Sequence, residues 1–303
     1  MRDNIKIAIS VPKVKRTKSH ISLKVRQGIV NEPSVYNKPP KILAVSDIEG
    51  NFVPFLKLLL ANKVIDRYLR WTFGDGHLVI VGDCFDRGEE VMECLWLIYY
   101  LEERARKVGG YVHFLLGNHE IMNLNGDWRY VHPKYAQSSN IPFTALYNGN
   151  NELWHWLCTK NVMEKIGDIL FVHAGVSPEL LQLNLSVSEI NHRIRPFYNS
   201  GNQSFDDPLL STVFNGTNSP FWYRGYYLSE NGVSEEVIDA TLKHFGVKTI
   251  VTGHTVVNQV TSYYNGKVIN IDTDHAAGQS EGLLIRKSRF YRVRYKMKRE
   301  RIK

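Results

Sequence analysis

Five short polar segments, each placed directly after an apolar run, constrain this chain more than any other feature. They occur in a fixed order: Asp47-Ile-Glu49-Gly-Asn51, Gly82-Asp83-Cys-Phe-Asp86-Arg87-Gly88, Gly117-Asn118-His119-Glu120, His173-Ala-Gly175 and Gly253-His254-Thr255. The apolar runs before them are typical of strands. Together the segments supply carboxylates, an amide and imidazoles, which are the oxygen and nitrogen ligands of hard and borderline divalent cations. Their order and their position at strand ends predict a catalytic metal site.

Strand and helix patterns alternate over the first half of the chain. We expect them in turn over five segments: 42–45, 52–61, 78–81, 90–107 and 111–116. Short apolar runs that end in Gly, Asp or Asn and precede helical patterns predict parallel strands joined by crossover helices. Ligands of such sheets bind beyond the carboxyl ends of the strands. Asp47, Asp83 and Asn118 all fall at those ends.

A different composition marks residues 125–165, which are richer in Asn, Tyr and Trp and end in a helical pattern at 152–159. We expect this segment to be a lid inserted over the site. Two extended runs follow at 162–166 and 169–172, and Gly167-Asp168 between them is a two-residue hairpin signal.

The rest of the chain is first helical and then extended. Residues 178–245 have mainly helical patterns, and strands are expected at 249–251, 259–264, 267–271, 282–286 and 290–295. We expect these last runs to form a second, mostly antiparallel sheet.

The formal charge of +8 belongs to the two ends of the chain. Residues 1–40 carry nine Lys or Arg against Asp3 and Glu32, and residues 286–303 carry ten against Glu300, so the middle is acidic. We therefore expect a basic N-terminal arm, 1–40, before a catalytic domain, 41–303. The arm is either one or two strands packed on the body with solvated lysines or a contact for a polyanion.

The cysteines and the hydropathy of the chain indicate the cellular compartment in which we expect the protein. The chain has three Cys, far apart and without a C-x-x-C pair, which argues against a disulfide framework or a zinc knuckle. No apolar run approaches the roughly 20 residues of a membrane span, and no signal peptide is evident. We expect a cytoplasmic protein that contacts no membrane.

A pair of dications needs an anionic bridge, because two cations a few ångströms apart repel each other. Asp83 is the candidate bridge. Asp47 and Glu49 would complete one metal site, and Asn118, His173 and His254 would complete the other. An isolated Asp at a strand end is usually a helix cap or a turn residue, but six candidates at one rim favour ligands.

Two arginines and one histidine complete the candidate site. Arg87, between Asp86 and Gly88, can present two parallel donors to a phosphoryl group, and Arg224 in its aromatic segment is a second candidate. His119 follows Asn118, so it can face the metals without binding them and protonate a departing oxygen, with Asp86 holding its other nitrogen. Among the other histidines, only His275 stands beside carboxylates that make it a candidate to lie near the cations, namely Asp272 and Asp274.

The motif order resembles the calcineurin-like metallophosphoesterases, in particular their phosphoprotein phosphatase branch. The segments 117–131, 171–178 and 222–225 are similar to the Shewanella-like protein phosphatases. The resemblance covers roughly residues 41–285 and implies an α/β fold, a sandwich of two mixed β-sheets flanked by helices.

The resemblance also implies roles at matching positions. It implies that Asp47 and Asp83 bind a first metal, and that the second metal is bound by Asp83, Asn118, His173 and His254. It further implies that Arg87 and Arg224 hold the phosphate and that His119 with Asp86 serves the leaving group.

One departure concerns the first motif, where the family's Asp-x-His is Asp47-Ile-Glu49 here. If Glu49 binds metal, it adds a negative oxygen donor and shifts preference toward manganese or magnesium and away from zinc or iron. If it turns away, the first metal binds weakly. We expect two divalent ions, with manganese favoured and magnesium, iron or zinc as alternatives.

The expected activity is hydrolysis of phosphomonoesters by direct attack of a metal-bridging hydroxide, on a phosphorylated protein (at Ser, Thr or Tyr) or a small phosphomonoester. One alternative is a nucleotide or dinucleoside polyphosphate hydrolase or a phosphodiesterase. Another is a catalytically weakened phosphate-binding module. The alternating basic residues near the C-terminus are typical of an exposed strand face, so nucleic acid is not expected as the partner. The oligomeric state is not predicted.

Overall fold

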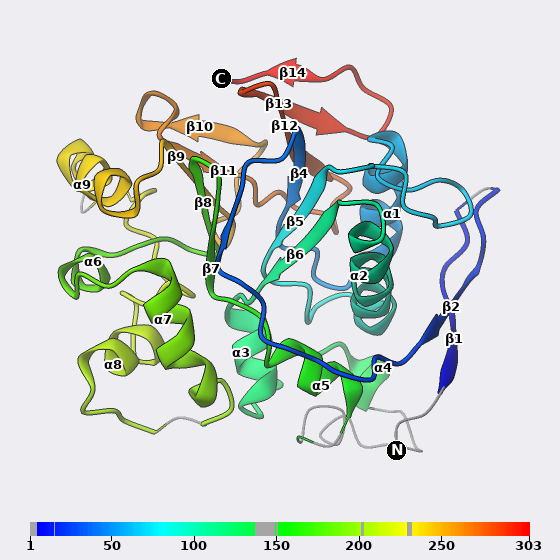
Figure 1. Ribbon diagram of the computed structural model, residues 1–303, viewed down its shortest axis with the longest axis horizontal. Helices are drawn as coiled ribbons and strands as arrows, with labels where there is room; N and C mark the ends of the chain where they lie inside the picture. Colours follow the sequence, from blue (N-terminus) through cyan, green and yellow to red (C-terminus); the bar gives the residue numbers. More distant parts are fainter. Residues whose placement is uncertain (1–4, 15, 137–148, 150, 201–202, 229–231) are drawn as a thin grey trace.

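The computed structural model of the chain describes residues 5–14, 16–136, 149, 151–200, 203–228 and 232–303. Within these residues, two six-stranded sheets form the centre of the molecule and helices lie on their outer sides (Figure 1). The expected α/β fold, two mixed sheets flanked by helices, is confirmed.

The first sheet contains the strands of the first three motifs. In spatial order its strands are β14 (Glu300–Arg301), β13 (Arg289–Arg294), β12 (Glu281–Arg286), β4 (Lys41–Val45), β5 (His77–Val81) and β6 (Tyr111–Leu115). β4, β5 and β6 are parallel, with Leu43 opposite Leu78 and Leu78 opposite Val112. Their carboxyl ends therefore meet at one edge, as the alternating pattern predicted.

The second sheet contains the strands of the last two motifs. Its order is β10 (Thr261–Tyr263), β11 (Val268–Asn270), β9 (Thr249–Thr252), β8 (Ile169–Val172), β7 (Met163–Ile166) and β3 (Val35–Tyr36). β7 and β8 are antiparallel around the expected Gly167-Asp168 turn, whereas β8, β9 and β11 are parallel. The parallel arrangement brings the ends of β8 and β9 together.

An apolar layer lies between the two sheets. Ile42 and Ala44 of β4 and Val79 and Val81 of β5 pack in one cluster with residues of the second sheet, among them Ile169, Phe171, Val251 and Ile269. Alternate residues of the same strands face the opposite way, because side chains alternate along a strand. Both faces of β4 and β5 are thus buried, which explains why they have nearly continuous apolar sequences.

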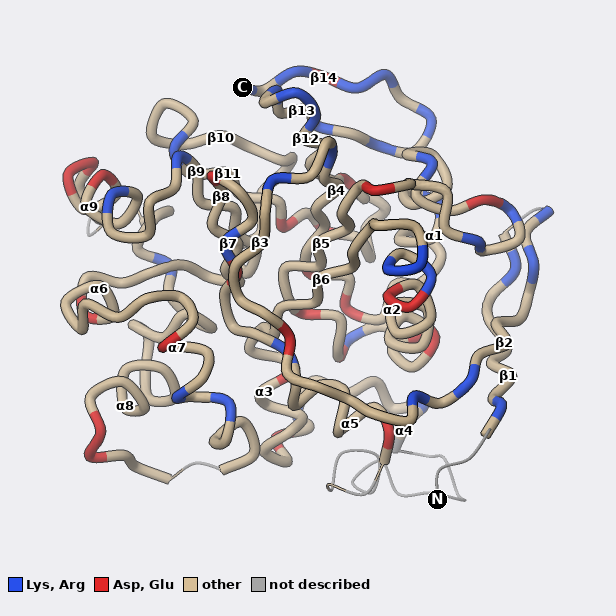
Figure 2. The backbone as a smooth tube through the Cα atoms, in the orientation of Figure 1, with Lys and Arg blue, Asp and Glu red and all other residues tan. Residues whose placement is uncertain are grey.

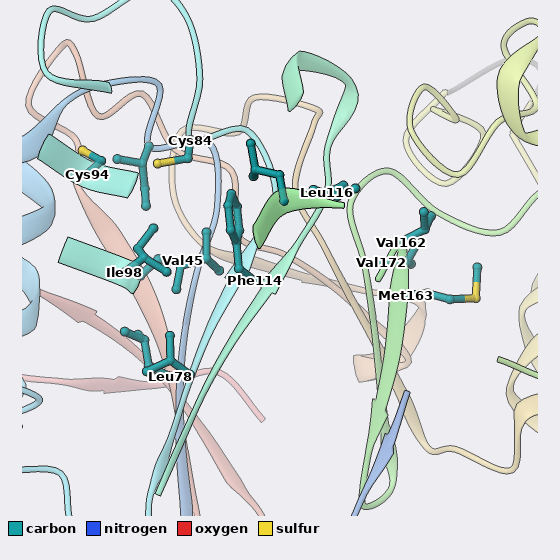
Figure 3. Packing of buried hydrophobic residues seen from close by; sticks show 14 of the residues in the cluster. Val45, Leu78, Cys84, Cys94, Ile98, Phe114, Leu116, Val162, Met163 and Val172 are labelled. Atoms are coloured by element: carbon teal, nitrogen blue, oxygen red, sulfur yellow. The ribbon is translucent and has the colours of Figure 1, made fainter. Parts of the chain in front are cut away.

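Two helices cover the outer face of the first sheet. They are α1 (Phe52–Ala61) and α2 (Val91–Arg106). Val45, Leu78 and Phe114 belong to the same core cluster as Ile98 of α2, and the close-up shows them with Cys84 and Cys94 nearby (Figure 3). Burial of each such aliphatic side chain contributes about 1.5–3 kcal/mol. The strands that lead to the site at the end of this sheet are therefore held rigidly by the core.

Helices also lie beside the second sheet, and short ones connect the layers. They are α3 (Asn118–Leu124), α6 (Pro178–Gln182), α7 (Val187–Ile194), α8 (Pro208–Phe214), α9 (Glu235–Phe245) and the 3-10 turns η2 (Arg195–Phe197) and η3 (Tyr264–Gly266). Ser186 caps α7 in a capping box with Glu189, and Asp207 caps α8. The helical expectation for residues 178–245 is confirmed.

The expectation of one second sheet built from the C-terminal strands is wrong. β9, β10 and β11 join the second sheet, but β12, β13 and β14 extend the first sheet through the antiparallel pairing of β12 with β4. Moreover, β9 is parallel to both of its neighbours. Sequence periodicity shows that a segment is a strand. Which strand it pairs with depends on which strand in the folded structure still has an unpaired edge.

The N-terminal segment contacts the body at several points. β1 (Lys6–Ser10) pairs with β2 (His20–Lys24), and this hairpin lies beside α2 (Figure 1). The Arg26 guanidinium donates to the buried Glu102 carboxylate of α2 over 2.7 Å. β3 pairs with β7 in the second sheet.

The expected lid is described only at its two ends, because 137–148 and 150 lie outside the described residues. The ends contain α4 (Pro133–Ala136) and α5 (Glu152–Leu157). Trp156 of α5 is fully buried and donates through Nε1 to Glu102 over 3.0 Å. α5 is therefore part of the packed body. No helix in the described part of the chain has the length and apolarity to span a bilayer.

Candidate metal centre

Five of the expected metal ligands lie directly beyond the carboxyl ends of strands. Asp47 follows β4, Asp83 follows β5, Asn118 follows β6, His173 follows β8 and His254 follows β9. All five are buried, with at most 6% of their surface exposed. Donor atoms of Asp83, His173 and His254 lie within 4.8 Å of one another. Both sheets thus contribute to one buried cluster of carboxylates and imidazoles.

The loops that carry these residues adopt an unusual backbone. Asp47, Asp83 and His254 have φ values of 52°, 53° and 66°, in the left-handed region that non-glycine residues rarely occupy. Such strain persists only where neighbouring structure enforces it. Here the first two loops bond to each other: Asp47 N–H donates to the Gly82 carbonyl over 3.1 Å, and Glu49 N–H donates to the Asp83 carbonyl over 2.9 Å.

Two motif glycines allow the loops to approach the carboxylates. A Cβ atom at Gly117 would overlap the Asp83 carboxylate, and one at Gly253 would overlap Ser46 and the Asp47 carboxylate. In their place, backbone donors reach the oxygens: His119 N–H donates to Asp83 Oδ1 over 3.0 Å, and His254 N–H donates to Asp47 Oδ2 over 3.1 Å. In both Asp83 and Asp47, one carboxylate oxygen is therefore fixed by a backbone hydrogen bond.

Glu120, which sequence reasoning gave no role, organises the Asp83 loop. Its Oε2 accepts from Asp83 N–H and Gly117 N–H, at 2.8 and 2.7 Å, and its Oε1 accepts from Cys84 N–H and Phe85 N–H, at 2.7 and 3.3 Å. Its burial and the charge of Asp83 raise the pKa of Glu120 to about 7. The signal in the sequence was its place in the Gly117-Asn-His-Glu120 motif.

His173 has the geometry of a metal ligand. Its Nδ1 donates to the Val81 carbonyl over 2.8 Å, which directs Nε2 into the site. Nε2 lies 3.0 Å from Asn118 Oδ1 and 3.2 Å from Asp83 Oδ2. Three potential donor atoms therefore converge, from three different strand ends.

The electrostatics of the cluster fit a cation. Burial raises the pKa of Asp47 to about 6 and, with the charge of His173, lowers that of His254 to about 3. For Asp83, burial acts to raise the pKa, but the charges of His173 and His119 outweigh burial and hold the pKa well below its ordinary value. Burial lowers the pKa of His173, yet Asp83 outweighs it and raises the pKa to about 10. A cation would take the place of the His173 proton between the same oxygens, so these residues fit the metals that the motifs imply.

The Glu49 carboxylate has two kinds of neighbour, an arginine and candidate metal ligands. One of its carboxylate oxygens pairs with Nη1 of Arg87. Glu49 also forms, with Asp83 and His119, a second group whose donor atoms lie within 4.8 Å of one another. The carboxylate is therefore at the site and shared with an arginine.

His119 is held beside the metal ligands by Asp86. Its Nδ1 lies 2.6 Å from Asp86 Oδ2, and its Nε2 lies 3.9 Å from Asp83 Oδ2. Asn123 donates through Nδ2 to Asp86 Oδ1 over 2.9 Å and so orients the carboxylate. Burial disfavours the charged ring, but Asp83 and the bond to Asp86 raise the pKa of His119. Asp83 and Asp86 therefore favour the protonated form of the ring.

Arg224 joins the cluster from the segment between α8 and α9. Its Nε donates to His254 Nε2 over 3.2 Å, and the Trp222 ring lies 5.6 Å from the His254 ring. A pocket of about 880 Å³ opens here, with Arg224, Trp222, Tyr130 and Met122 in its lining. The Tyr130 ring lies 5.3 Å from His119, so the pocket adjoins the site.

Asp272, which sequence reasoning noted only as a neighbour of His275, lies near the site. It is 3% exposed, and burial together with the charge of Asp47 raises its pKa well above the ordinary value. The available signal was its position after the apolar run at 267–271. His275 itself bonds through Nδ1 to Ser280 over 2.7 Å, and it belongs to neither of the ligand groups found among the described residues.

Comparison with known proteins agrees with this geometry. Residues 40–258 match the model of the calcineurin-like phosphoesterase family. The chain belongs to that family. Because its members hydrolyse phosphoesters, the chain is a phosphoester hydrolase with a divalent metal site, and the resemblance seen in the motifs is confirmed.

Several relatives are similar to this calcineurin-like phosphoesterase over most of their length. An uncharacterised protein of Schizosaccharomyces pombe is 33% identical, over 78% of this chain and 73% of its own. Shewanella-like protein phosphatase 2 of Arabidopsis thaliana is 27% identical, over 82% and 74%. The crystal structure of a cold-active protein-tyrosine phosphatase from a psychrophilic Shewanella species superposes with a TM-score of 0.88, at 37% identity, covering 97% of this chain and 89% of that one.

Proposed function

We propose that this phosphoesterase is a dinuclear metal-dependent phosphatase that hydrolyses phosphomonoesters on proteins. The observation that carries the proposal is the position of His173 Nε2, 3.0 Å from Asn118 Oδ1 and 3.2 Å from Asp83 Oδ2. Similarity to proteins named as protein phosphatases supports the class of substrate.

The proposed ligands divide between two metals that share Asp83. Asp47 and Glu49 would bind the first, and the second would be bound by Asn118, His173 and His254. Bound divalent cations supply activation of water and neutralisation of charge on the phosphoryl oxygens. Manganese is the proposed metal, because oxygen donors predominate in the set.

Two guanidinium groups are proposed to hold the phosphoryl group. Arg87 is paired with Glu49, and Arg224 with His254, so each is already located beside proposed metal ligands. Planar guanidinium groups bind phosphate oxygens through two parallel donors. Two such groups suit a dianionic monoester, because a diester has one negative charge fewer.

His119 is proposed to protonate the leaving oxygen. Asp86 holds Nδ1, so the proton on Nε2 points into the site and is available for transfer. Loss of this proton leaves a neutral ring that Asp86 continues to orient. The residues therefore supply orientation, charge and a proton, and no phosphorylated enzyme intermediate is needed.

Asp83→Asn is the direct test. We expect it to abolish manganese-dependent hydrolysis of an aryl phosphate and of a phosphopeptide while circular dichroism shows a native fold. Glu89→Gln, at an exposed carboxylate, is the matched control. A folded Asp83→Asn protein with unimpaired turnover would refute the proposal.

Substrate class is tested with a panel of phosphotyrosine, phosphoserine and phosphothreonine peptides, a diaryl phosphate and a dinucleoside tetraphosphate. We expect the phosphopeptides to be hydrolysed fastest. Faster hydrolysis of the tetraphosphate or the diester would reject a protein phosphatase and favour a nucleotide hydrolase or a diesterase.

Two further features remain proposals. A cytoplasmic location is supported by three cysteines, Cys84, Cys94 and Cys158, none of which is in a disulfide. We also propose that the described start of the expected lid, residues 125–136, borders the site, since the Tyr130 ring adjoins His119.

A further inference from the structure

A strongly basic groove lies on the first sheet, away from the metal centre. It has a volume of about 670 Å³ and is bounded by the end of α1 and by β12 and β13. No Asp or Glu lines it among the described residues, but many cations do: Lys41, Lys63, Arg286, Arg294, Lys296 and Arg299. Figure 2 shows Lys and Arg along β13, β14 and the segment that joins them. We call this feature the basic groove.

Within the part of the chain that the structure describes, most of these cations have no carboxylate partner. Arg294 pairs with the buried Glu281 over 2.5 Å. For the other five, no carboxylate oxygen of a described residue lies within 4.0 Å. Arg286, Lys296 and Arg299 are moreover exposed. Because unpaired like charges repel each other, their concentration in one concave site favours an anion there.

Aromatic rings hold three of the cations in position. Lys41 Nζ lies 4.4 Å from the centre of the Phe73 ring, Lys296 Nζ lies 5.3 Å from that of Tyr295, and Arg299 Cζ lies 4.9 Å from that of Tyr291. Cation–π contacts orient the charges before an anion binds. They also cover ring faces on which the bases of a nucleic acid would otherwise stack. This arrangement favours carboxylates over a polynucleotide.

We propose that the basic groove binds an acidic polypeptide segment, a run of Asp and Glu residues carried by the phosphorylated substrate. The role of the segment as part of a substrate rests on the proposed function. The binding itself does not, because the groove and the metal centre share no residue.

The position of the groove predicts the spacing on the substrate. Lys41 begins β4 and Asp47 follows the other end of that strand, so the two sites lie roughly 20 Å apart at about 3.3 Å per residue. An extended chain needs at least about six residues to cover that distance, and more to follow the surface. We therefore expect an acidic run to act when about ten residues separate it from the phosphorylated residue.

The first experiment measures binding without catalysis. A fluorescent peptide of about ten residues, half of them Glu, is titrated with the full-length protein at about 0.05 M and 0.3 M salt. The test variant is Arg286→Glu with Lys296→Glu. The control is Lys13→Glu with Lys248→Glu, which makes the same charge change at exposed positions outside the groove. A peptide with Gln in place of Glu controls for charge.

We expect the Glu peptide to bind the wild type, more weakly at the higher salt, and the test variant to lose at least tenfold in affinity while the control variant loses less than twofold. Equal losses in both variants would overturn the proposal, since they would mean a general charge effect. Tighter binding of a single-stranded oligonucleotide at this groove would also overturn it.

The second experiment measures catalysis. A phosphopeptide joined through ten Gly or Ser residues to the acidic run is compared with the same phosphopeptide joined to the Gln run. We expect a several-fold lower KM for the acidic substrate, lost in the test variant, with hydrolysis of an aryl phosphate unchanged. Equal KM values would overturn a substrate role for the groove, whereas absence of all phosphopeptide hydrolysis beside intact peptide binding would refute the proposed function alone.

Discussion

His119 Nδ1 and Asp86 Oδ2 lie 2.6 Å apart, and both residues are almost fully buried. Asn123 bonds to the second oxygen of the carboxylate, so the pair has a single orientation. Asp86 and His119 belong to different motifs, and they meet because β5 and β6 are adjacent parallel strands. A protonated ring held in this way can act as a general acid.

We predict that His119→Asn slows hydrolysis in a manner that depends on the leaving group. Loss of a general acid lowers the rate by about 10²–10⁴ when the leaving group is a poor one such as an alkoxide. An acidic phenol needs little protonation, so nitrophenyl phosphate should be affected much less. The measurement is kcat for phosphoserine peptide and nitrophenyl phosphate in parallel, and equal losses for both substrates would assign His119 another role.

Removal of metal should lower stability as well as activity. A cation bound between buried Asp47 and Asp83 relieves the repulsion of two carboxylates in a desolvated site. At about 100 times its Kd, a bound ion stabilises the folded state by about 2.7 kcal/mol. We expect chelation to lower the melting temperature and manganese to restore it in the wild type but not in Asp83→Asn, which removes the shared ligand. Restoration in that variant would indicate that the stabilising ion binds elsewhere.

Glu120→Gln should destabilise the Asp83 loop. Both oxygens of Glu120 accept two backbone N–H groups each, so either orientation of a Gln amide would direct its NH₂ group at two donors. Leaving such buried groups unpaired costs about 1–3 kcal/mol. Urea unfolding is the measurement, and exposed Glu89→Gln, expected to change stability by less than about 0.5 kcal/mol, is its control. Equal stability of both variants would contradict this role.

Glu49→His should change the metal preference. The substitution restores the imidazole of the family motif and removes the carboxylate that pairs with Arg87. Nitrogen donors suit zinc and iron better than a carboxylate does. We expect elemental analysis after purification to show less manganese and more zinc or iron, whereas Glu49→Gln should lose manganese without that gain. An unchanged metal content in Glu49→His would place Glu49 outside the ligand set.

A histidine pair far from the metal centre, His113 buried and His77 partly exposed, should make stability depend on pH. His77 Nδ1 lies 2.9 Å from His113 Nε2, and Glu164 bonds to His113 on its other side. Burial and the charge of His113 lower the pKa of His77 to about 3 from 6.5. The unfolded chain therefore binds the proton more readily, and this stabilisation is present above pH 6.5 and is lost as the pH falls toward 3.

The matching variant is His77→Gln, which cannot titrate. After allowance for the partial exposure of His77, the wild type should lose on the order of 1 kcal/mol more stability than the variant between pH 7 and pH 5. Urea unfolding at the two pH values gives the comparison. A variant with the same pH dependence as the wild type would show that other groups are responsible.

Several local elements follow directly from the sequence. The helix expected at 52–61 is α1, the strands expected at 78–81 and 169–172 are β5 and β8, and the hairpin at Gly167-Asp168 is present. Periodicity and turn residues act over a few neighbouring positions, so they can be read from the chain itself. The strand-end motifs likewise identified the residues that now lie at the buried cluster.

Contacts between residues distant in the chain could not be predicted from the sequence. The sheet in which β12 and β13 lie depends on the free edge of β4, which no local pattern reveals. Asp272 and Glu120 were not expected to matter, because their importance comes from neighbours distant in sequence. The basic groove combines Lys41 and Lys63 with residues near 290, and only folding brings them together.

The amino-acid sequence by itself determined the chemistry: which donors exist, that they follow strands, and that the middle of the chain is acidic. Tertiary structure decided which of those groups touch, how Glu49 is shared with Arg87, and where the charge of the C-terminal strands gathers. The physical reason is that backbone propensity and periodicity are short-range properties, whereas contacts between loops depend on the packing of two whole sheets.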